Sequence, residues 1–184
     1  MRRLAPAAML ATLWFAAPAL AQVERLSCAD VAASRWEPGH DEDTQEFEGF
    51  NTVEVILVCE QELADAPDNV EIKAWLGHAY LHEGRDDEAA KLLAEAARAG
   101  NPVAQMVLSD MYANGWAVTV DRQQALTMLT ASAGQGFAPA QLALGDAYRW
   151  GDGLTAKDLA KAREWYDKAA EQGITANPVH VLDR

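Results

Sequence analysis

Positive charge and cysteine are both scarce in this sequence. The 184 residues include 15 lysines and arginines against 28 aspartates and glutamates, and 2 cysteines. The formal net charge of −13 makes nucleic acids and anionic lipid surfaces poor partners, because like charges repel. We therefore expect a partner of neither kind.

Motifs of well-known enzyme classes are missing as well. No serine beyond the N-terminal segment begins a Ser-x-x-Lys motif or lies within Gly-x-Ser-x-Gly, the spacings that place nucleophilic serines in two hydrolase classes. No glycine-rich phosphate loop is present, and no segment alternates apolar and polar residues as a half-buried strand does. The sequence predicts an all-α, non-enzymatic protein without a cofactor.

The first 21 residues have the pattern of a secretory signal peptide. Arg2 and Arg3 precede a short apolar stretch over residues 9–17, and small residues follow up to Ala21. We expect cleavage after Ala21 and a mature protein that is periplasmic or secreted, with no membrane insertion. A transmembrane anchor fits less well, because the apolar stretch is short and Pro18 interrupts it.

The two cysteines, Cys28 and Cys59, both lie beyond this segment. In an oxidising compartment an even number of cysteines favours a disulfide. The loop that it would close spans about 30 residues and would stabilise the folded chain by roughly 3–4 kcal/mol in the chain-entropy description. A redox pair would favour the closer Cys-x-x-Cys spacing, so we interpret the two cysteines as a structural disulfide.

A pattern of apolar, acidic and glycine residues occurs twice at an interval of 36 residues. Four matched pairs define it: Leu108 and Leu144, Asp110 and Asp146, Tyr112 and Tyr148, and Gly115 and Gly151. A shorter copy upstream has Leu76, Gly77 and Tyr80 in the same places. Repeats of this length are typical of stacked helix pairs, which bury their apolar faces only against neighbouring pairs.

Six helices are predicted in this repeated part. The first helices of the pairs cover 70–83, 103–114 and 139–150, and the second helices cover 86–99, 121–135 and 158–172. Each second helix begins at an acidic residue, which suits the positive end of the helix dipole. Each one ends near a glycine, the usual left-handed helix stop.

The final unit closely resembles the Sel1-like repeat. The matching residues are Gly151-Asp-Gly153-Leu154 and then Asp158-Leu-Ala-Lys-Ala162-Arg-Glu-Trp165-Tyr166-Asp-Lys-Ala169-Ala170-Glu-Gln-Gly173. The unit before it keeps three residues of that motif, namely Ala125, Gln135 and Gly136. Residues 70–102 are more similar to a tetratricopeptide repeat, through Leu76, Gly77, Tyr80, Ala89, Leu93 and Ala96.

This resemblance implies an exported bacterial Sel1-type protein whose fold is a right-handed α-solenoid of stacked antiparallel helix pairs. Together with the signal peptide and the cysteines, it divides the chain into a signal peptide (1–21), a divergent N-terminal helical repeat with the expected disulfide (22–69), a tetratricopeptide-like repeat (70–102), two Sel1-like repeats (103–138 and 139–175) and a C-terminal cap (176–184). Small residues are expected where paired helices approach closely, at Gly77, Gly145, Ala96, Ala133 and Ala170. Large residues are expected to fill the space between pairs, at Tyr80, Leu93, Tyr112, Tyr148 and Trp165.

His78 and His82 lie four residues apart on one predicted helix, so both side chains can point the same way. This spacing permits two contacts to one metal ion, but the His-Glu-x-x-His motif is absent because Ala79 follows His78. Two interpretations stay open. The pair either contacts solvent and a partner, or belongs to a metal site.

The tetratricopeptide resemblance implies that six side chains line a concave groove: His78, His82, Asp110, Asn114, Asp146 and Trp150. No lysine or arginine occupies these positions, so the groove suits a partner that carries amines or amides. We therefore expect a non-enzymatic scaffold or adaptor that binds a protein or peptide of the cell envelope. The alternative is a metal-handling or hydrolytic envelope protein that uses His78 and His82.

Overall fold

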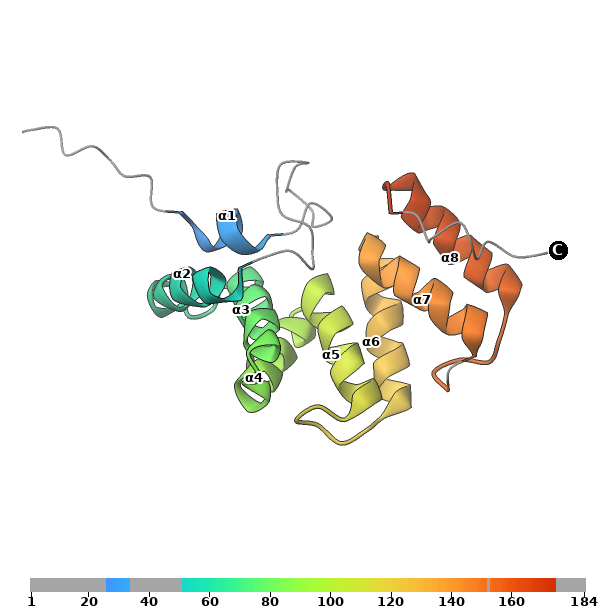
Figure 1. Cartoon of the computed structure of the whole chain (residues 1–184), viewed down its shortest axis with the longest axis horizontal. Coiled ribbons are helices and arrows are strands. Elements are labelled where there is room, and N and C mark those ends of the chain that lie inside the picture. The colour runs from blue at the N-terminus through green and yellow to red at the C-terminus, as the bar shows by residue number, and fades with distance from the viewer. Residues whose placement is uncertain (1–25, 34–50, 152, 175–184) are drawn as a thin grey trace, which may run out of the picture.

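The computed structural model describes residues 26–33, 51–151 and 153–174, and every regular element in these ranges is an α-helix. The predicted signal peptide and C-terminal cap lie outside the described residues. Each of the six helices predicted from residue 70 onward is present, with bounds within one residue of the prediction. In chain order the helices are α1 (Cys28–Ala32), α2 (Thr52–Asp65), α3 (Val70–His82), α4 (Asp86–Arg98), α5 (Pro102–Asn114), α6 (Arg122–Gly134), α7 (Ala138–Trp150) and α8 (Leu159–Glu171) (Figure 1).

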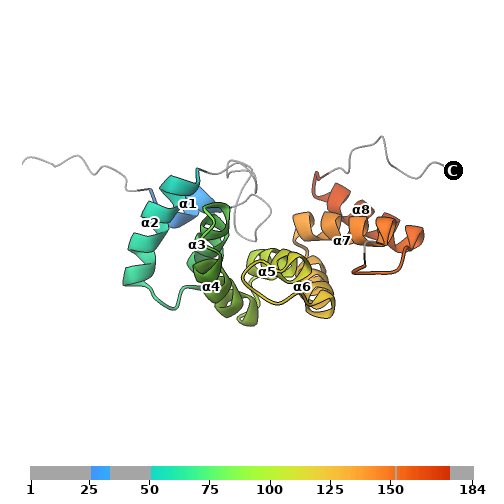
Figure 2. The same ribbon diagram turned by 60° about the horizontal axis from the view of Figure 1, so that its bottom comes forward.

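Neighbouring helices form pairs that stack along the chain. α3 packs on α4, α5 on α6 and α7 on α8, and successive pairs meet where α4 contacts α5 and α6 contacts α7. Figures 1 and 2 show the pairs following one another as in a solenoid. The predicted all-α architecture of stacked helix pairs is confirmed. None of the described helices is both long and apolar enough to cross a bilayer.

Short polar side chains begin most of the helices. Those of Asn69, Asn101 and Asp121 each accept a hydrogen bond from the backbone amide three residues later. This bond satisfies an amide that has no partner within the helix. α4 begins at Asp86, as predicted, but the residue before it, Arg85, makes no side-chain capping bond.

Two glycines 36 residues apart open the turns of the last two helix pairs. Gly115 has a φ of 79° and Gly151 a φ of 64°, in the left-handed region where a Cβ atom is unfavourable. At Gly151 a Cβ would also lie 2.9 Å from the backbone nitrogen of Lys157. Both turns therefore depend on glycine at this position.

The N-terminal part is tied to the stack by a disulfide between Cys28 of α1 and Cys59 of α2, whose Cα atoms are 4.7 Å apart. This confirms the predicted pairing, and both cysteines are fully buried. Ser27 and Asp30 form a capping box at the start of α1. In addition, the backbone nitrogen of Cys28 donates a 3.0 Å hydrogen bond to Glu62 of α2.

Close approach within the helix pairs explains two further glycines. A Cβ atom on Gly77 would lie 2.8 Å from Leu93 Cγ, and one on Gly145 would lie 2.6 Å from the ring of Tyr166. The prediction that these glycines sit where helices approach closely is confirmed. The ring that packs on Gly145 belongs to Tyr166, a residue outside the predicted set of space-filling side chains.

The position of Tyr166 along its helix explains this contact. Leu93, Leu129 and Tyr166 each lie eight residues after the N-cap of their helix. Residues at the same distance from the start of equivalent helices point in the same direction, so the three positions are equivalent. Trp165 is half-buried, with the Lys168 ammonium 3.8 Å from its ring centre.

Several other packing predictions can be compared with burial. Ala96, Ala133 and Tyr80 are buried as expected. Ala170 is exposed, because no described helix follows α8 to cover it. The predicted space-filling residues Tyr112 and Tyr148 are only half-buried against the core.

Paired glutamines link the two helices of a repeat and connect that repeat to the one before it. Gln135 Nε2 donates to Gln105 Oε1 at 2.7 Å, and one repeat later Gln172 Nε2 donates to Gln141 Oε1 at 2.8 Å. The amides of Gln105 and Gln141 also donate to the carbonyls of Ala97 and Ala133, respectively, in the preceding second helix. Burying these amides is tolerated because their polar atoms find partners.

Candidate functional site

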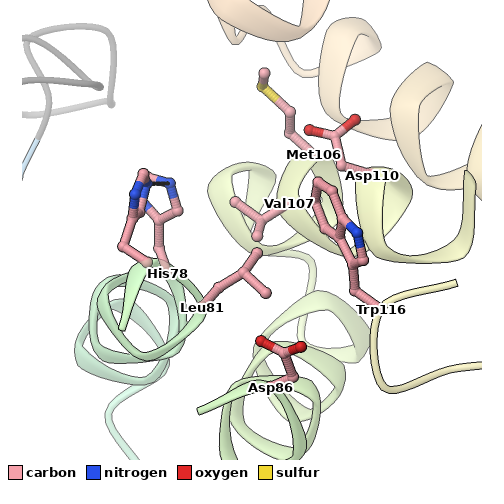
Figure 3. A pocket seen from close by; sticks show the side chains of 8 residues that line it. His78, Leu81, Asp86, Met106, Val107, Asp110 and Trp116 are labelled. Atoms are coloured by element: carbon pink, nitrogen blue, oxygen red, sulfur yellow. Dashed lines mark hydrogen bonds between the residues drawn. The ribbon is translucent and has the colours of Figure 1, made fainter. Parts of the chain in front are cut away.

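A pocket of about 600 Å³ opens between α3, the start of α4, α5 and the turn after α5. Figure 3 shows His78 on one side and Asp110 and Trp116 on the other, with Leu81 and Val107 between them. The floor is therefore apolar and the rim is polar. The lining residues are His78, Leu81, His82, Asp86, Met106, Val107, Asp110 and Trp116.

Three of the six predicted groove residues come together in this pocket: His78, His82 and Asp110. The other three do not line it. Asn114 turns its side-chain amide back to the carbonyl of Asp110, at 2.9 Å. Asp146 accepts a 2.7 Å hydrogen bond from the Tyr166 hydroxyl, and Trp150 is 61% exposed beside Arg149.

The two histidines contact each other directly. His78 Nε2 and His82 Nε2 are 3.1 Å apart, so one ring donates and the other accepts according to tautomer. The rings meet edge to face, with centroids 4.7 Å apart. Burial, with a smaller contribution from neighbouring His82, lowers the pKa of His78 to about 3. His78 is therefore neutral at physiological pH.

A metal site at this pair would need a third protein ligand beside the two histidines. In the part of the chain that the structure describes, no three histidine, cysteine or acidic side chains converge so as to hold a metal ion. Protein zinc sites normally supply at least three protein ligands. Both histidines line the pocket.

Asp110 has an unusual carboxyl group for a residue at the rim. Its side chain is exposed, yet the surrounding protein removes enough water to raise its pKa to about 6. Within the described ranges this carboxylate accepts no hydrogen bond and forms no ion pair. A partly dehydrated carboxylate without a partner is open to a cationic ligand.

Sequence reasoning missed Trp116, which closes one side of the pocket. It follows Gly115 in the turn after α5, where its backbone nitrogen donates to the carbonyl of Met111, and it remains 44% exposed. The sequence did carry a signal for it. Trp116 directly follows Gly115, a glycine in the left-handed conformation that turns the chain back across the end of the helix.

A second hollow of about 390 Å³ lies between α2, α3 and α4, but Glu60, Tyr80 and Glu88 in its lining already have partners. The Tyr80 hydroxyl donates to Glu60 at 2.7 Å, and burial and this bond raise its pKa to about 12. Arg85 bridges Glu60 and Glu88 and stacks over the Tyr80 ring. These interactions occupy the groups that a ligand would need.

Comparison with known proteins identifies the repeats. The Sel1 repeat family matches residues 102–137 and 138–174, and a tetratricopeptide repeat family matches residues 51–110. No protein of curated function matches the chain significantly.

Two solved structures share both fold and sequence with it. A Sel1 repeat protein from Oxalobacter formigenes is 28% identical with a TM-score of 0.55, over 64% of this chain and 90% of that one. The protective antigen c5321 of uropathogenic Escherichia coli, which displays an SLR fold, is 30% identical with a TM-score of 0.57. That match covers 76% of this chain but only 29% of the antigen. The chain thus belongs to the Sel1-like and tetratricopeptide repeat proteins.

Proposed function

We propose that this protein is a non-enzymatic scaffold that binds a protein or peptide through the face carrying the pocket between α3, α4 and α5. Sel1 and tetratricopeptide repeats generally bind protein partners and are generally not catalytic. The observation that carries the proposal is the pocket itself, where apolar side chains and the carboxylates of Asp86 and Asp110 are presented together. Such a mixture of apolar and polar groups is typical of a recognition site.

We also propose that the partner belongs to the cell envelope. The predicted signal peptide and the disulfide between Cys28 and Cys59 support this location, because disulfides persist mainly in oxidising compartments. Determination of the mature N-terminus tests the proposal. A first residue of Gln22 in protein from the periplasm would support it, and an uncleaved chain in the cytoplasm would contradict it.

Site-specific cross-linking tests the binding function. A photoreactive phenylalanine analogue placed at Trp116 should form covalent adducts with a discrete partner in envelope extracts. The same analogue at Leu57, which is 67% exposed on α2, serves as the control on another surface. Equal adducts at both positions, or none at Trp116, would contradict a partner site at the pocket.

A further inference from the structure

We infer that the pocket between α3, α4 and α5 receives a lysine or arginine side chain of the partner protein. This inference rests on the proposed binding function and adds the chemistry of the anchor. Three features of the pocket carry it: an apolar floor, an aromatic face without a cation, and a carboxylate without a partner.

The floor fits the hydrocarbon part of a long basic side chain. Leu81 from α3 and Met106 and Val107 from α5 line the pocket, and Val107 is almost fully buried. Lysine and arginine commonly lay their methylene groups along such apolar surface while the charged end reaches polar groups. A short acidic or amide side chain would leave this floor uncovered.

Trp116 offers an aromatic face for the charged end. Elsewhere among the described residues, basic groups lie over the rings of four aromatic residues, at 3.7–5.1 Å from the centroids: Tyr80, Tyr148, Trp150 and Trp165. Among the described residues no cation lies over Trp116, although indole is the strongest cation–π acceptor of the side chains. This ring is therefore available to a cation from outside.

Asp110 supplies the countercharge, as comparison with its equivalent in the next repeat shows. Asp146 already accepts a hydrogen bond from Tyr166, whereas Asp110 has no such donor within the described ranges. An incoming ammonium or guanidinium group would stabilise the charged form of this dehydrated carboxylate.

No lysine or arginine of the pocket competes for this position. Its lining contains no lysine or arginine, and His78 is held neutral by burial. Asp86 adds a second carboxylate at the other edge. The acidic chain as a whole, with a formal charge of −13, also attracts a basic segment over longer distances.

Nuclear magnetic resonance titration of the full mature protein, disulfide intact and with EDTA present, tests the inference. The probes are three capped peptides of the same sequence whose central residue is lysine, acetyl-lysine or norleucine. The lysine peptide should shift the Trp116 indole N–H and the amides of Met106 and Val107 saturably, with an affinity about fivefold or more above the neutral peptides. Asp110→Asn and Trp116→Ala should each lower that affinity to the level of the neutral peptides.

Asp146→Asn and Trp150→Ala are matched controls, since both change the same residue types outside the pocket and should leave the affinity unchanged. Equal binding of norleucine and lysine would overturn the inference, as would lysine binding that survives Asp110→Asn in a folded variant. Neither result would remove the Trp116 cross-links, which test the binding function by themselves. Loss of the cross-links, in turn, would contradict the scaffold proposal whatever the peptides do.

Discussion

The hydroxyl of Tyr166 donates a 2.7 Å hydrogen bond to the carboxylate of Asp146, and this bond distinguishes the last repeat from the one before it. In the preceding repeat Leu129 stands at the position of Tyr166 and has no group to donate. Asp110, the equivalent of Asp146, therefore keeps an unpartnered carboxylate at the pocket. One substitution between repeats thus turns a structural aspartate into a candidate binding residue.

Removing this hydroxyl should weaken the last repeat. Tyr166→Phe keeps the ring over Gly145 but leaves the half-buried Asp146 without its donor, and we expect a loss of about 1 kcal/mol in the free energy of unfolding. Urea unfolding followed by circular dichroism measures it. Tyr112→Phe is the control, because within the described ranges the Tyr112 hydroxyl makes no hydrogen bond. Equal losses in both variants would mean that the bond contributes nothing specific.

Gly145→Ala should destabilise the protein by about 1–3 kcal/mol, because the new Cβ would lie 2.6 Å from the Tyr166 ring and the helices would have to separate. Gly134→Ala makes the same change in α6 where no atom lies within 4 Å of the new Cβ. We expect that control to leave stability unchanged or raise it by about 0.5–1 kcal/mol.

A double variant shows whether the ring is the cause. Combining Gly145→Ala with Tyr166→Leu places a small residue at position 145 and a leucine at position 166. The preceding repeat has the same combination at the equivalent positions, Ser109 and Leu129. Its loss of stability should be smaller than the sum of the two single losses. Simple additivity in thermal or urea unfolding would contradict a direct clash.

Sequence reasoning predicted the helix pairs well, because their determinants are local. Apolar spacing, capping residues and turn glycines recur at fixed intervals, so the bounds of the six helices from residue 70 onward could be placed within one residue. The contacts of Gly77 and Gly145 were predictable for the same reason. The repeat pattern itself fixes which small residue faces the neighbouring helix.

The site was only partly predictable, because its properties depend on residues distant in sequence. The repeat pattern makes Asp110 and Asp146 equivalent, and nothing near either one shows that Tyr166 satisfies only the second. Helical spacing placed His78 and His82 on one face, but packing in the stack decides that His78 is buried and His82 exposed. Trp116 reaches the pocket only through the path of its turn.

The disulfide gives a prediction about the N-terminal part. Replacing both Cys28 and Cys59 with alanine should lower the free energy of unfolding by about 3–4 kcal/mol, because the open chain regains loop entropy. Thiol labelling of denatured, unreduced protein from the periplasm should detect no free thiol. Two labelled thiols there would contradict both the disulfide and the oxidising location.

Acid should destabilise the protein through His78. Burial keeps its folded pKa near 3, while a histidine in the unfolded chain keeps its ordinary pKa of 6.5. Between these values the unfolded chain binds a proton that the native state does not, so stability falls as the pH falls. At pH 5 the expected loss from this residue is about 2 kcal/mol. His78→Gln should remove this part of the pH dependence.

Asp110 should act in the opposite direction over nearly the same range. Its folded pKa is about 6 against an ordinary aspartate pKa of 3.8, so the native state binds the extra proton and acid raises stability until the pH nears the lower value. Urea unfolding between pH 7 and pH 4 should therefore show a steeper acid loss in Asp110→Asn than in the wild type, and a shallower one in His78→Gln. His82 and Asp86, which also line the pocket, remain in both variants, so differences from the wild type report the changed residue. Parallel curves for all three proteins would show that neither group titrates abnormally.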